Sequence, residues 1–219
     1  ADRGITVSTI GLGMGNYKDT RMEQLANKGD GNNYYVDSTE EAQNIFVDGF
    51  NGTMITIARD VKIQMEFNPK VVESYRLIGY ENRDIADKDF RNDRVDAGEV
   101  GAGHAVTALY ELKLKDAVDT NIATARIRYE APGADKAAQE RAFLFSKAGI
   151  RKAPSNAMAV AYTAAGFAEI LRRSPYAKSM TLSDLSSYGD RYIVTKSKYT
   201  QELLELIEKA KDLSAPIGD

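Results

Sequence analysis

The sequence predicts an α+β protein: a partial α/β segment comes first, an antiparallel β-sandwich follows, and a helical segment ends the chain. Three observations predict this order. Residues 1–52 alternate strand-like and helix-like runs. Residues 53–150 alternate apolar and polar side chains with the two-residue period of strands that bury one face. Residues 151–219 place their apolar side chains at helical spacing and are expected to pack on the sandwich.

The first segment predicts a strand at residues 5–10 and a second strand at residues 34–36. Between them it predicts a helix that starts near residue 16, has Leu25 among its buried residues and ends at Lys28-Gly29. Lys28-Gly29 supplies a cationic last turn and a glycine stop. Ser38 and Glu41 have the spacing of a capping box, which predicts that a second helix begins directly after Ser38.

The middle segment contains five predicted strands. The clearest covers residues 61–67, in which apolar and polar side chains alternate until Pro69 ends the run. The other strands are expected at residues 72–80, 105–114, 122–129 and 141–145. Several short strands, joined by turns such as Pro132-Gly133, are typical of a small β-sandwich.

The last segment predicts three helices. Pro154-Ser155 precedes an alanine-rich helix, and Ser174-Pro175 ends it because the residue before a proline avoids helical geometry. Thr181 is expected to cap a short second helix, and a third helix follows over residues 199–210.

Composition and charge exclude several classes of function. The 219 residues carry 29 basic and 32 acidic side chains, so no basic surplus favours binding to nucleic acid. Cysteine is absent, which excludes disulfides and thiol chemistry. No apolar run approaches the ~20 residues that span a bilayer, so we expect no membrane insertion. The chain begins at Ala1, only a few residues before a strand, and we expect it to be a fragment or a processed product.

The glycines after the first strand raise a nucleotide-dependent enzyme as an alternative. Gly11 and Gly13 fit the first two positions of the G-x-G-x-x-G dinucleotide fingerprint. Gly15 stands one place early, and Asn16 occupies the third glycine position. Asp37 lies further along than the ~20 residues that usually separate the fingerprint from its ribose-binding acid. We therefore favour a structural loop between strand and helix.

Several strings in the first segment resemble a known domain. Gly4-Ile5-Thr6-Val7-Ser8-Thr9-Ile10-Gly11-Leu12-Gly13 is similar to a strand of the von Willebrand factor type A domain. Met22-Glu23-Gln24-Leu25-Ala26-Asn27-Lys28-Gly29 is similar to the helix that follows it. Asn33-Tyr34-Tyr35-Val36-Asp37-Ser38, with Glu41-Ala42, resembles the last strand and helix of that domain. The resemblance implies that residues 1–52 are the C-terminal remnant of such a domain.

From residue 61 onward the chain resembles the C-terminal extension that follows this domain in a group of bacterial envelope proteins. The resemblance implies a periplasmic or cell-surface location, in a secreted or lipid-anchored parent, and it implies no activity for the extension. The strings that carry it are Phe67-Asn68-Pro69, Tyr75-Arg76-Leu77-Ile78-Gly79-Tyr80-Glu81-Asn82-Arg83, Asp93-Arg94-Val95-Asp96-Ala97-Gly98-Glu99-Val100-Gly101-Ala102-Gly103-His104, Thr107-Ala108-Leu109-Tyr110-Glu111 and Leu171-Arg172-Arg173-Ser174-Pro175-Tyr176.

The same resemblance implies a divalent cation, Mg²⁺, in the intact A-type domain, held by Asp-x-Ser-x-Ser with a later Thr and Asp. The nearest string here, Asp184-Leu185-Ser186-Ser187-Tyr188, lacks the final serine and lies in the helical segment. We therefore expect no metal site, no cofactor and no catalytic residue in this chain, and we expect the cation site to lie upstream of residue 1.

Residues 81–99 contain the candidate protein-contact loop. Acidic and basic side chains interleave there without the ligand spacing and central glycine of an EF-hand, which favours a salt-bridged surface loop over a calcium site. A connection of this length is often functional. His104, the single histidine, is expected to begin the next strand rather than to act in catalysis. The candidate contact residues are Asp84, Asp87, Asp89, Arg91, Asp93 and Arg94.

The sequence thus favours a non-enzymatic protein-interaction or structural module with an unidentified protein partner. The incomplete sheet of residues 1–52 would leave an exposed edge, which predicts self-association or packing of these strands on the sandwich. Two alternatives stay open. One is a nucleotide-dependent enzyme that uses Gly11, Gly13 and Gly15, and the other is a carbohydrate-binding β-sandwich that displays some of the 12 tyrosines.

Overall fold

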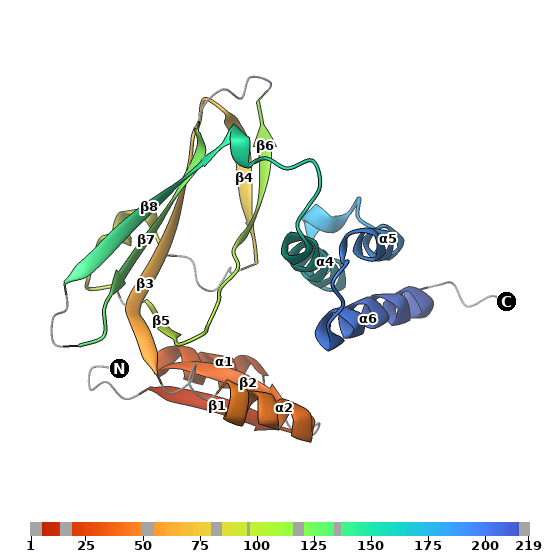
Figure 1. The fold of residues 1–219 in the computed structure, drawn as a ribbon, viewed down its shortest axis with the longest axis horizontal. Helices are drawn as coiled ribbons and strands as arrows, with labels where there is room; N and C mark the ends of the chain where they lie inside the picture. Colours follow the sequence, from red (N-terminus) through yellow and green to blue (C-terminus); the bar gives the residue numbers. More distant parts are fainter. Residues whose placement is uncertain are drawn as a thin grey trace. The chain divides into compact units, whose positions relative to one another are not determined.

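The computed structural model describes residues 6–13, 19–49, 55–79, 85–95, 97–115, 121–133 and 137–214. The protein is a mixed α+β fold with antiparallel sheets and C-terminal helices, as the sequence predicts (Figure 1). Its chain forms two compact units. The first unit comprises residues 1–68, 84–106 and 119–146, and the second comprises residues 69–83, 107–118 and 147–219. These boundaries differ from the limits at residues 52 and 150 that the sequence suggests.

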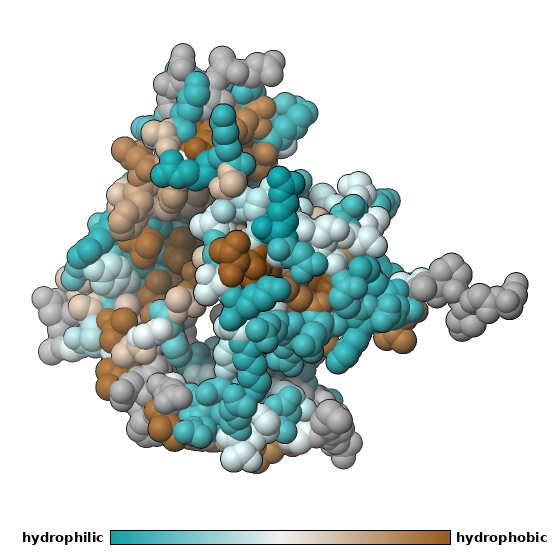
Figure 2. Space-filling view, turned by 45° about the vertical axis from the view of Figure 1, so that its right-hand side comes forward, coloured by the Kyte–Doolittle hydropathy of each residue, from teal (hydrophilic) through white to brown (hydrophobic). Residues whose placement is uncertain are grey.

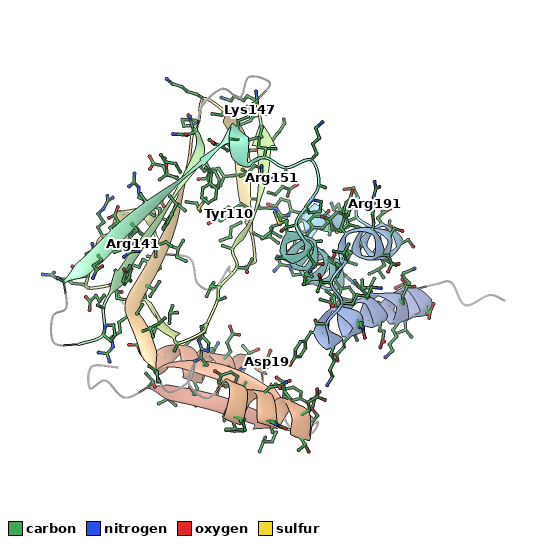
Figure 3. The ribbon with its side chains drawn as sticks, viewed as in Figure 1. Asp19, Tyr110, Arg141, Lys147, Arg151 and Arg191 are labelled. Carbon is green, nitrogen blue, oxygen red and sulfur yellow. The ribbon has the colours of Figure 1, made fainter. Side chains whose placement is uncertain are left out.

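The first unit opens with a strand, a helix and a second strand. β1 (Val7–Leu12) and β2 (Asp30–Val36) pair in parallel, and α1 (Asp19–Lys28) connects them. Asp19 stands in the first turn of α1 (Figure 3), where a negative charge favours the positive end of the helix dipole. The predicted start of this helix near residue 16 lies outside the described residues. A parallel pair joined by a helix is the arrangement that residues 1–52 predict; its relationship to a von Willebrand A-type domain stays a prediction.

Gly29, which follows α1, and Gly31, at the start of β2, allow this part of the chain to approach β1 closely. A Cβ atom on Gly31 would lie 2.2 Å from the carbonyl oxygen of Val7, and a Cβ atom on Gly29 would lie 2.6 Å from Cβ of Val7. Any larger residue would therefore push the strands apart. On the other side of this contact, the buried hydroxyl of Thr9 donates a hydrogen bond to the carbonyl of Met22 at 3.0 Å, which ties β1 to α1.

A second helix follows as predicted. α2 (Thr39–Gln43) begins after Ser38, whose hydroxyl accepts a hydrogen bond from the backbone N–H of Glu41 at 3.2 Å. This is the amide-capping half of the predicted capping box. A single π-helical turn, η1 (Asn44–Asp48), continues the helix.

A four-stranded antiparallel sheet makes up the rest of the first unit, in the order β5-β3-β7-β8. Its register aligns Ala125 with Phe143 on one face and Arg128 with Glu140 on the other. Because side chains alternate along each strand, the sheet has an apolar face and a charged face. Its strands are β3 (Thr56–Phe67), β5 (Gly98–Gly101), β7 (Asn121–Glu130) and β8 (Ala138–Ser146).

The second unit combines a two-stranded antiparallel ribbon with the helices. The ribbon pairs β4 (Val72–Ile78) with β6 (Leu109–Leu114). Leu185, Ile193 and Ile207 are almost fully buried among the helices. The helical elements are η3 (Lys147–Gly149), α4 (Asn156–Leu171), η4 (Pro175–Ala177), α5 (Leu182–Tyr192) and α6 (Lys198–Ser214).

The caps of these helices follow the sequence. Ser155 accepts a hydrogen bond from the backbone N–H of Met158 at 3.2 Å and begins α4. Thr181 and Asp184 form a full capping box at the start of α5, in which each side chain binds the backbone N–H of the other residue. The prediction that Thr181 caps a helix is therefore confirmed.

The expected strand at residues 105–114 is wrong in its first half. β4 ends at Ile78, which pairs with Leu109, and Gly79 then turns the chain with a φ angle of 77°. Residues 104–108 therefore form no part of a strand, and His104 does not begin one. β5 was not expected, because four residues with glycine at both ends show no hydrophobic period.

A considerable part of the surface is apolar. Brown apolar patches interrupt the hydrophilic surface in Figure 2. Leu12, Val47, Leu144 and Val194 each expose more than half of their surface. Leu25 is 54% exposed, whereas its spacing in the first segment suggests a buried side chain.

Candidate functional site

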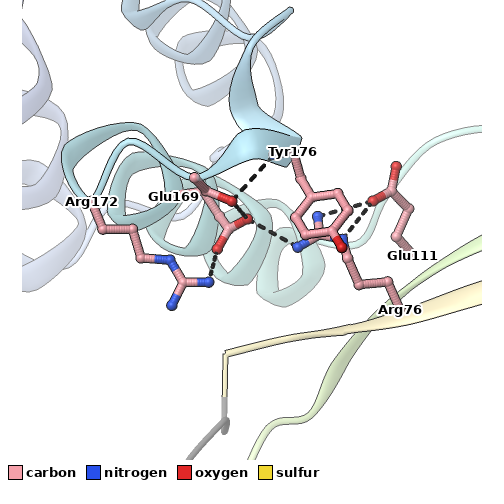
Figure 4. A network of polar contacts seen from close by, with 6 residues as sticks. Arg76, Glu111, Glu169, Arg172 and Tyr176 are labelled. Atoms are coloured by element: carbon pink, nitrogen blue, oxygen red, sulfur yellow. Dashed lines mark hydrogen bonds and ion pairs between the residues drawn. The ribbon is translucent and has the colours of Figure 1, made fainter.

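Arg76 is the centre of a polar cluster within the second unit (Figure 4). It stands on β4 directly opposite Glu111 on β6, so both side chains point to the same face of the ribbon. The Nε and Nη2 atoms of Arg76 donate hydrogen bonds to Oε2 of Glu111 at 3.2 and 2.9 Å. Its Nη1 atom donates to Oε2 of Glu169 on α4 at 2.9 Å. Arg76 therefore links the ribbon to the helices of the same unit.

Glu169 is the buried acceptor of this cluster, with 6% of its side chain exposed. Besides Arg76, it accepts a hydrogen bond from the hydroxyl of Ser174 at 2.8 Å and a short one from Nη2 of Arg172. Burial alone would raise the pKa of Glu169, but the hydrogen bonds from Ser174 and Arg76 and the charge of Arg172 outweigh burial and lower that pKa. The carboxylate is therefore held in its ionised form.

The end of α4 brings Ser174 back to Glu169. Arg173 adopts the left-handed conformation, with a φ of 55°, that usually favours glycine at a helix end. The backbone N–H of Ser174 then donates to the carbonyl of Glu169 at 2.9 Å, closing the turn. The Ser174 hydroxyl accepts in turn from the N–H of Tyr176 at 3.3 Å, which begins η4. The predicted helix stop at Ser174-Pro175 therefore also places the Ser174 hydroxyl beside the Glu169 carboxylate.

An open cleft of about 430 Å³ lies beside the cluster. Tyr176 is 65% exposed, and the guanidinium carbon of Arg76 lies 4.1 Å from the centre of its ring. The lining residues are Arg76, Leu77, Arg172, Arg173, Ser174, Pro175 and Tyr176. The charged residues of its lining are three arginines, while the Glu169 carboxylate, which binds two of them, already accepts three hydrogen bonds.

The predicted contact loop has become part of the first unit's charged sheet face. Asp93 accepts a hydrogen bond from Arg128 on β7, and Arg91 binds Glu140 on β8 through two hydrogen bonds of 2.9 Å each. The hydrogen bond from Arg128 lowers the pKa of Asp93, and the hydrogen bonds from Arg91 lower the pKa of Glu140.

The other candidate contact residues lie nearby. Asp87 accepts from the side-chain amide of Gln64 at 3.2 Å, and Asp89 accepts from that of Asn92 at 3.0 Å. The side chain of Arg94 is exposed, and Asp84 lies outside the described residues. The loop is salt-bridged, as its composition suggests, and its role in protein contact stays a prediction.

Comparison with known proteins identifies the family. Residues 52–121 and 113–213 match the family described as "Uncharacterized protein YfbK, C-terminal". The chain belongs to this family. It is also 33% identical over 229 residues to the "Uncharacterized protein YfbK" of Escherichia coli strain K12. That alignment covers 95% of this chain and 39% of the relative, so the chain spans about two fifths of the relative's length. No solved structure matches the chain.

The family match covers the Arg76 cluster. Residues 76, 111, 169 and 172–176 all lie within the matched ranges of the YfbK C-terminal family. Three of the strings that carry the resemblance from residue 61 onward contribute to the cluster, through Arg76, Glu111 and the run from Arg172 to Tyr176. Sequence reasoning did not find this site, because its members are distant in sequence and only the fold brings them together.

The divalent cation of an A-type domain does not fit the residues described in this YfbK-family chain. Among them, no group of three or more His, Asp or Glu side chains is placed to hold a metal ion. In the string nearest to the cation motif, the Asp184 carboxylate accepts from the Thr181 hydroxyl at 2.6 Å, and Ser186 donates to Glu208. No helix in the described ranges combines the length and the apolar character needed to cross a bilayer.

Proposed function

We propose that this chain is a non-enzymatic protein-interaction module and that the Arg76 cleft receives a carboxylate-bearing segment of a protein partner. The observation that carries the proposal is the imbalance between donors and acceptors in the cleft. Each arginine has five N–H donors. Three arginines line the cleft, while the buried acceptor Glu169 already accepts three hydrogen bonds. A ligand with hydrogen-bond acceptor groups is complementary to the three arginines that line the cleft.

The state of Glu169 argues against acid–base chemistry at this site. A general acid or base needs a pKa close to the working pH. The pKa of Glu169 is instead lowered, away from neutral pH, because Ser174, Arg76 and Arg172 all stabilise its ionised form. The carboxylate therefore acts as a fixed counter-charge that orients Arg76 and Arg172. The exposed ring of Tyr176 and the side chain of Pro175 add an apolar shelf on which a peptide can lie.

Arg173 is the side chain best placed to bind a ligand without disturbing the cluster. It is exposed and lines the cleft, and its guanidinium group makes no hydrogen bond or ion pair with another described residue. An ion pair formed there would replace no internal contact. Binding through such surface charges is expected to be weak and to fall with rising salt.

A titration followed by NMR tests the proposal. The probe is a peptide of alternating Glu and Gly, and the comparison peptide carries Gln in place of each Glu. We expect the Glu peptide to shift the amide signals of Ser174 and Tyr176, and we expect Arg173→Gln to weaken binding about tenfold, or ~1.4 kcal/mol. Arg141→Gln is the matched control, because Arg141 is an exposed arginine on β8 in the other unit (Figure 3).

Two results would contradict the proposal. One is equal binding of the Glu and Gln peptides, which would show that the carboxylates are not recognised. The other is an equal loss of affinity in Arg141→Gln and Arg173→Gln, which would show that only the overall charge matters. Stabilisation of the protein by NAD or ATP in a thermal-shift titration would instead favour the nucleotide-dependent alternative at Gly11 and Gly13.

We also propose, from the resemblance of residues 1–52, that the module belongs to a von Willebrand A-type parent in the bacterial envelope, with its Mg²⁺ site in the part of the parent that precedes this chain. The parallel β1–β2 pair with its connecting helix supports this proposal, because parallel strands are normally found in larger sheets with both faces covered. Sequencing of the parent gene tests it. An Asp-x-Ser-x-Ser string and an export signal would support the proposal, and their absence would overturn it.

A further inference from the structure

β8 is an edge strand of unusual character. It is the last strand of the first unit's sheet, and no described strand pairs with its outer edge. The opposite edge, β5, has four residues with glycine at both ends, so it offers little for another strand to pair with. β8 has nine residues without proline. Edge strands of proteins are usually shortened, charged or covered, because their free N–H and C=O groups attract other strands.

The second half of β8 has the composition of an interior strand. Phe143 and Phe145 are 49% and 51% exposed on the apolar face of the sheet. Leu144 points to the opposite face and is 67% exposed. Interior strands carry apolar side chains on both faces, whereas an edge strand that stays single usually carries charge. The charged residues of β8, Glu140 and Arg141, lie in its first half.

We propose that two copies of this chain associate through antiparallel pairing of their β8 strands, with Leu144 at the two-fold axis. In this register Phe143 of each copy faces Phe145 of the other, and Leu144 faces its own counterpart. Both faces of the joined edge then match apolar with apolar side chains, and aromatic cross-strand pairs of this kind are favourable. In this register, residues 142–146 of one copy are complementary to the same five residues of the other. A second copy of this chain is therefore the partner that this edge fits.

The pairing segment is short. It extends from Ala142 to Ser146, because η3 begins at Lys147 and an extension of the ladder would set Arg141 against Lys147 (Figure 3). Stable dimers commonly bury about 1,200 Å² or more, which is beyond a five-residue ladder alone. The dimer is therefore weak and depends on protein concentration. The pairing segment belongs to the first unit, whereas all residues that line the Arg76 cleft belong to the second.

Single cysteines test the register directly, because the chain contains no cysteine of its own. Directly opposed residues of antiparallel strands have Cα atoms about 4.5–5.5 Å apart, which is within the ~4.4–6.8 Å that a disulfide spans. Leu144→Cys is expected to form a disulfide-linked dimer rapidly under mild oxidation. Ala142→Cys is the matched control: its counterpart lies four residues along the strand, about 14 Å away, and it should link only slowly.

Light scattering across a range of protein concentrations provides the second measurement. The unmodified chain and the control Val194→Lys, at an exposed position in the other unit, should show a mass that rises toward that of a dimer. Leu144→Lys should stay monomeric at the same concentrations, because a buried pair of lysines at the axis would repel. A chain that is monomeric throughout, a dimer that survives Leu144→Lys, or equal cross-linking of Leu144→Cys and Ala142→Cys would each overturn the proposal.

Discussion

Arg76 and Glu169 are 93 residues apart in sequence, yet Nη1 of the arginine lies 2.9 Å from Oε2 of the glutamate. This bond joins a strand to the last turn of a helix within one unit. Its two members differ in exposure: 21% of the Arg76 side chain is exposed, but only 6% of that of Glu169. The pair is therefore closer to a buried ion pair than to a surface one, and its loss should be costly.

Glu169→Ala should lower the free energy of unfolding by about 3 kcal/mol, because it leaves Arg76, Arg172 and Ser174 without their shared acceptor. Glu111→Ala is the control. Glu111 also binds Arg76, but 64% of its side chain is exposed, so we expect a loss of less than about 1 kcal/mol. Urea denaturation measures both. Similar losses in the two variants would show that the network has no buried centre.

The stability conferred by Glu169 should depend on pH. Folding lowers the pKa of Glu169 below its usual value of 4.5, so the unfolded chain binds this proton more readily than the folded chain does. The contribution is complete above about pH 4.5 and is lost as pH falls through the lower pKa of the folded state. The stability difference between the unmodified chain and Glu169→Gln should therefore shrink as acid is added. A difference that stays constant from neutral pH to acid would contradict the assignment.

Gly189→Ala should destabilise the helices of the second unit. A Cβ atom at this position of α5 would lie 2.6 Å from Cδ2 of Leu204 on α6. The resulting overpacking is expected to cost about 1–3 kcal/mol. This cost is partly offset because alanine is ~1 kcal/mol more favourable than glycine in the interior of a helix. In a Leu204→Ala background the clash disappears, so Gly189→Ala should become neutral or stabilising there. Thermal denaturation of the four proteins in this cycle checks the prediction.

Lys62 connects the charged sheet face to the residues that follow η2 (Asp87–Asp89). Only 1% of its side chain is exposed, and its ammonium group donates to Asp60 and to the carbonyl of Asn92, at 2.9 Å each. Lys62→Met would leave the largely buried Asp60 without its cation, at a cost of about 3 kcal/mol. Hydrogen exchange at residues 85–95 should rise in this variant. Lys88→Met, at an exposed position near Asn92, should change neither stability nor exchange.

The sequence predicts the structural features that a short stretch of chain determines by itself, such as helix caps and single strands. The caps at Ser38 and Thr181 act within three residues, so their spacing alone reveals them. The alternation of residues 61–67 likewise predicts a strand that the structure contains as part of β3. The longer reach of β3, from Thr56, passes through a bulge near Asp60 that breaks the alternation, and this explains why the expected strand was too short.

The cluster at Arg76 could not be predicted in the same way. Glu169 reads as one polar residue in an alanine-rich helix, and Ser174 reads as a helix stop. Their common role depends on the bond that joins Arg76 on β4 to Glu169 on α4, and no local pattern in the sequence indicates this bond. The one signal in the sequence was the resemblance of the strings around Arg76 and Arg172 to the same extension, and this points to a shared origin rather than to contact.

The interleaving of the two units also constrains the order in which they can form during synthesis. The first unit lacks β8 until residue 146 has left the ribosome, although its first strands are made within the first 40 residues. The β4–β6 ribbon of the second unit is complete by residue 114 but must wait for α4 before Arg76 can meet Glu169. Neither unit is a continuous piece of chain, so a truncation that removes one also cuts into the other. Neither unit can therefore complete its fold before residue 146 has been synthesised.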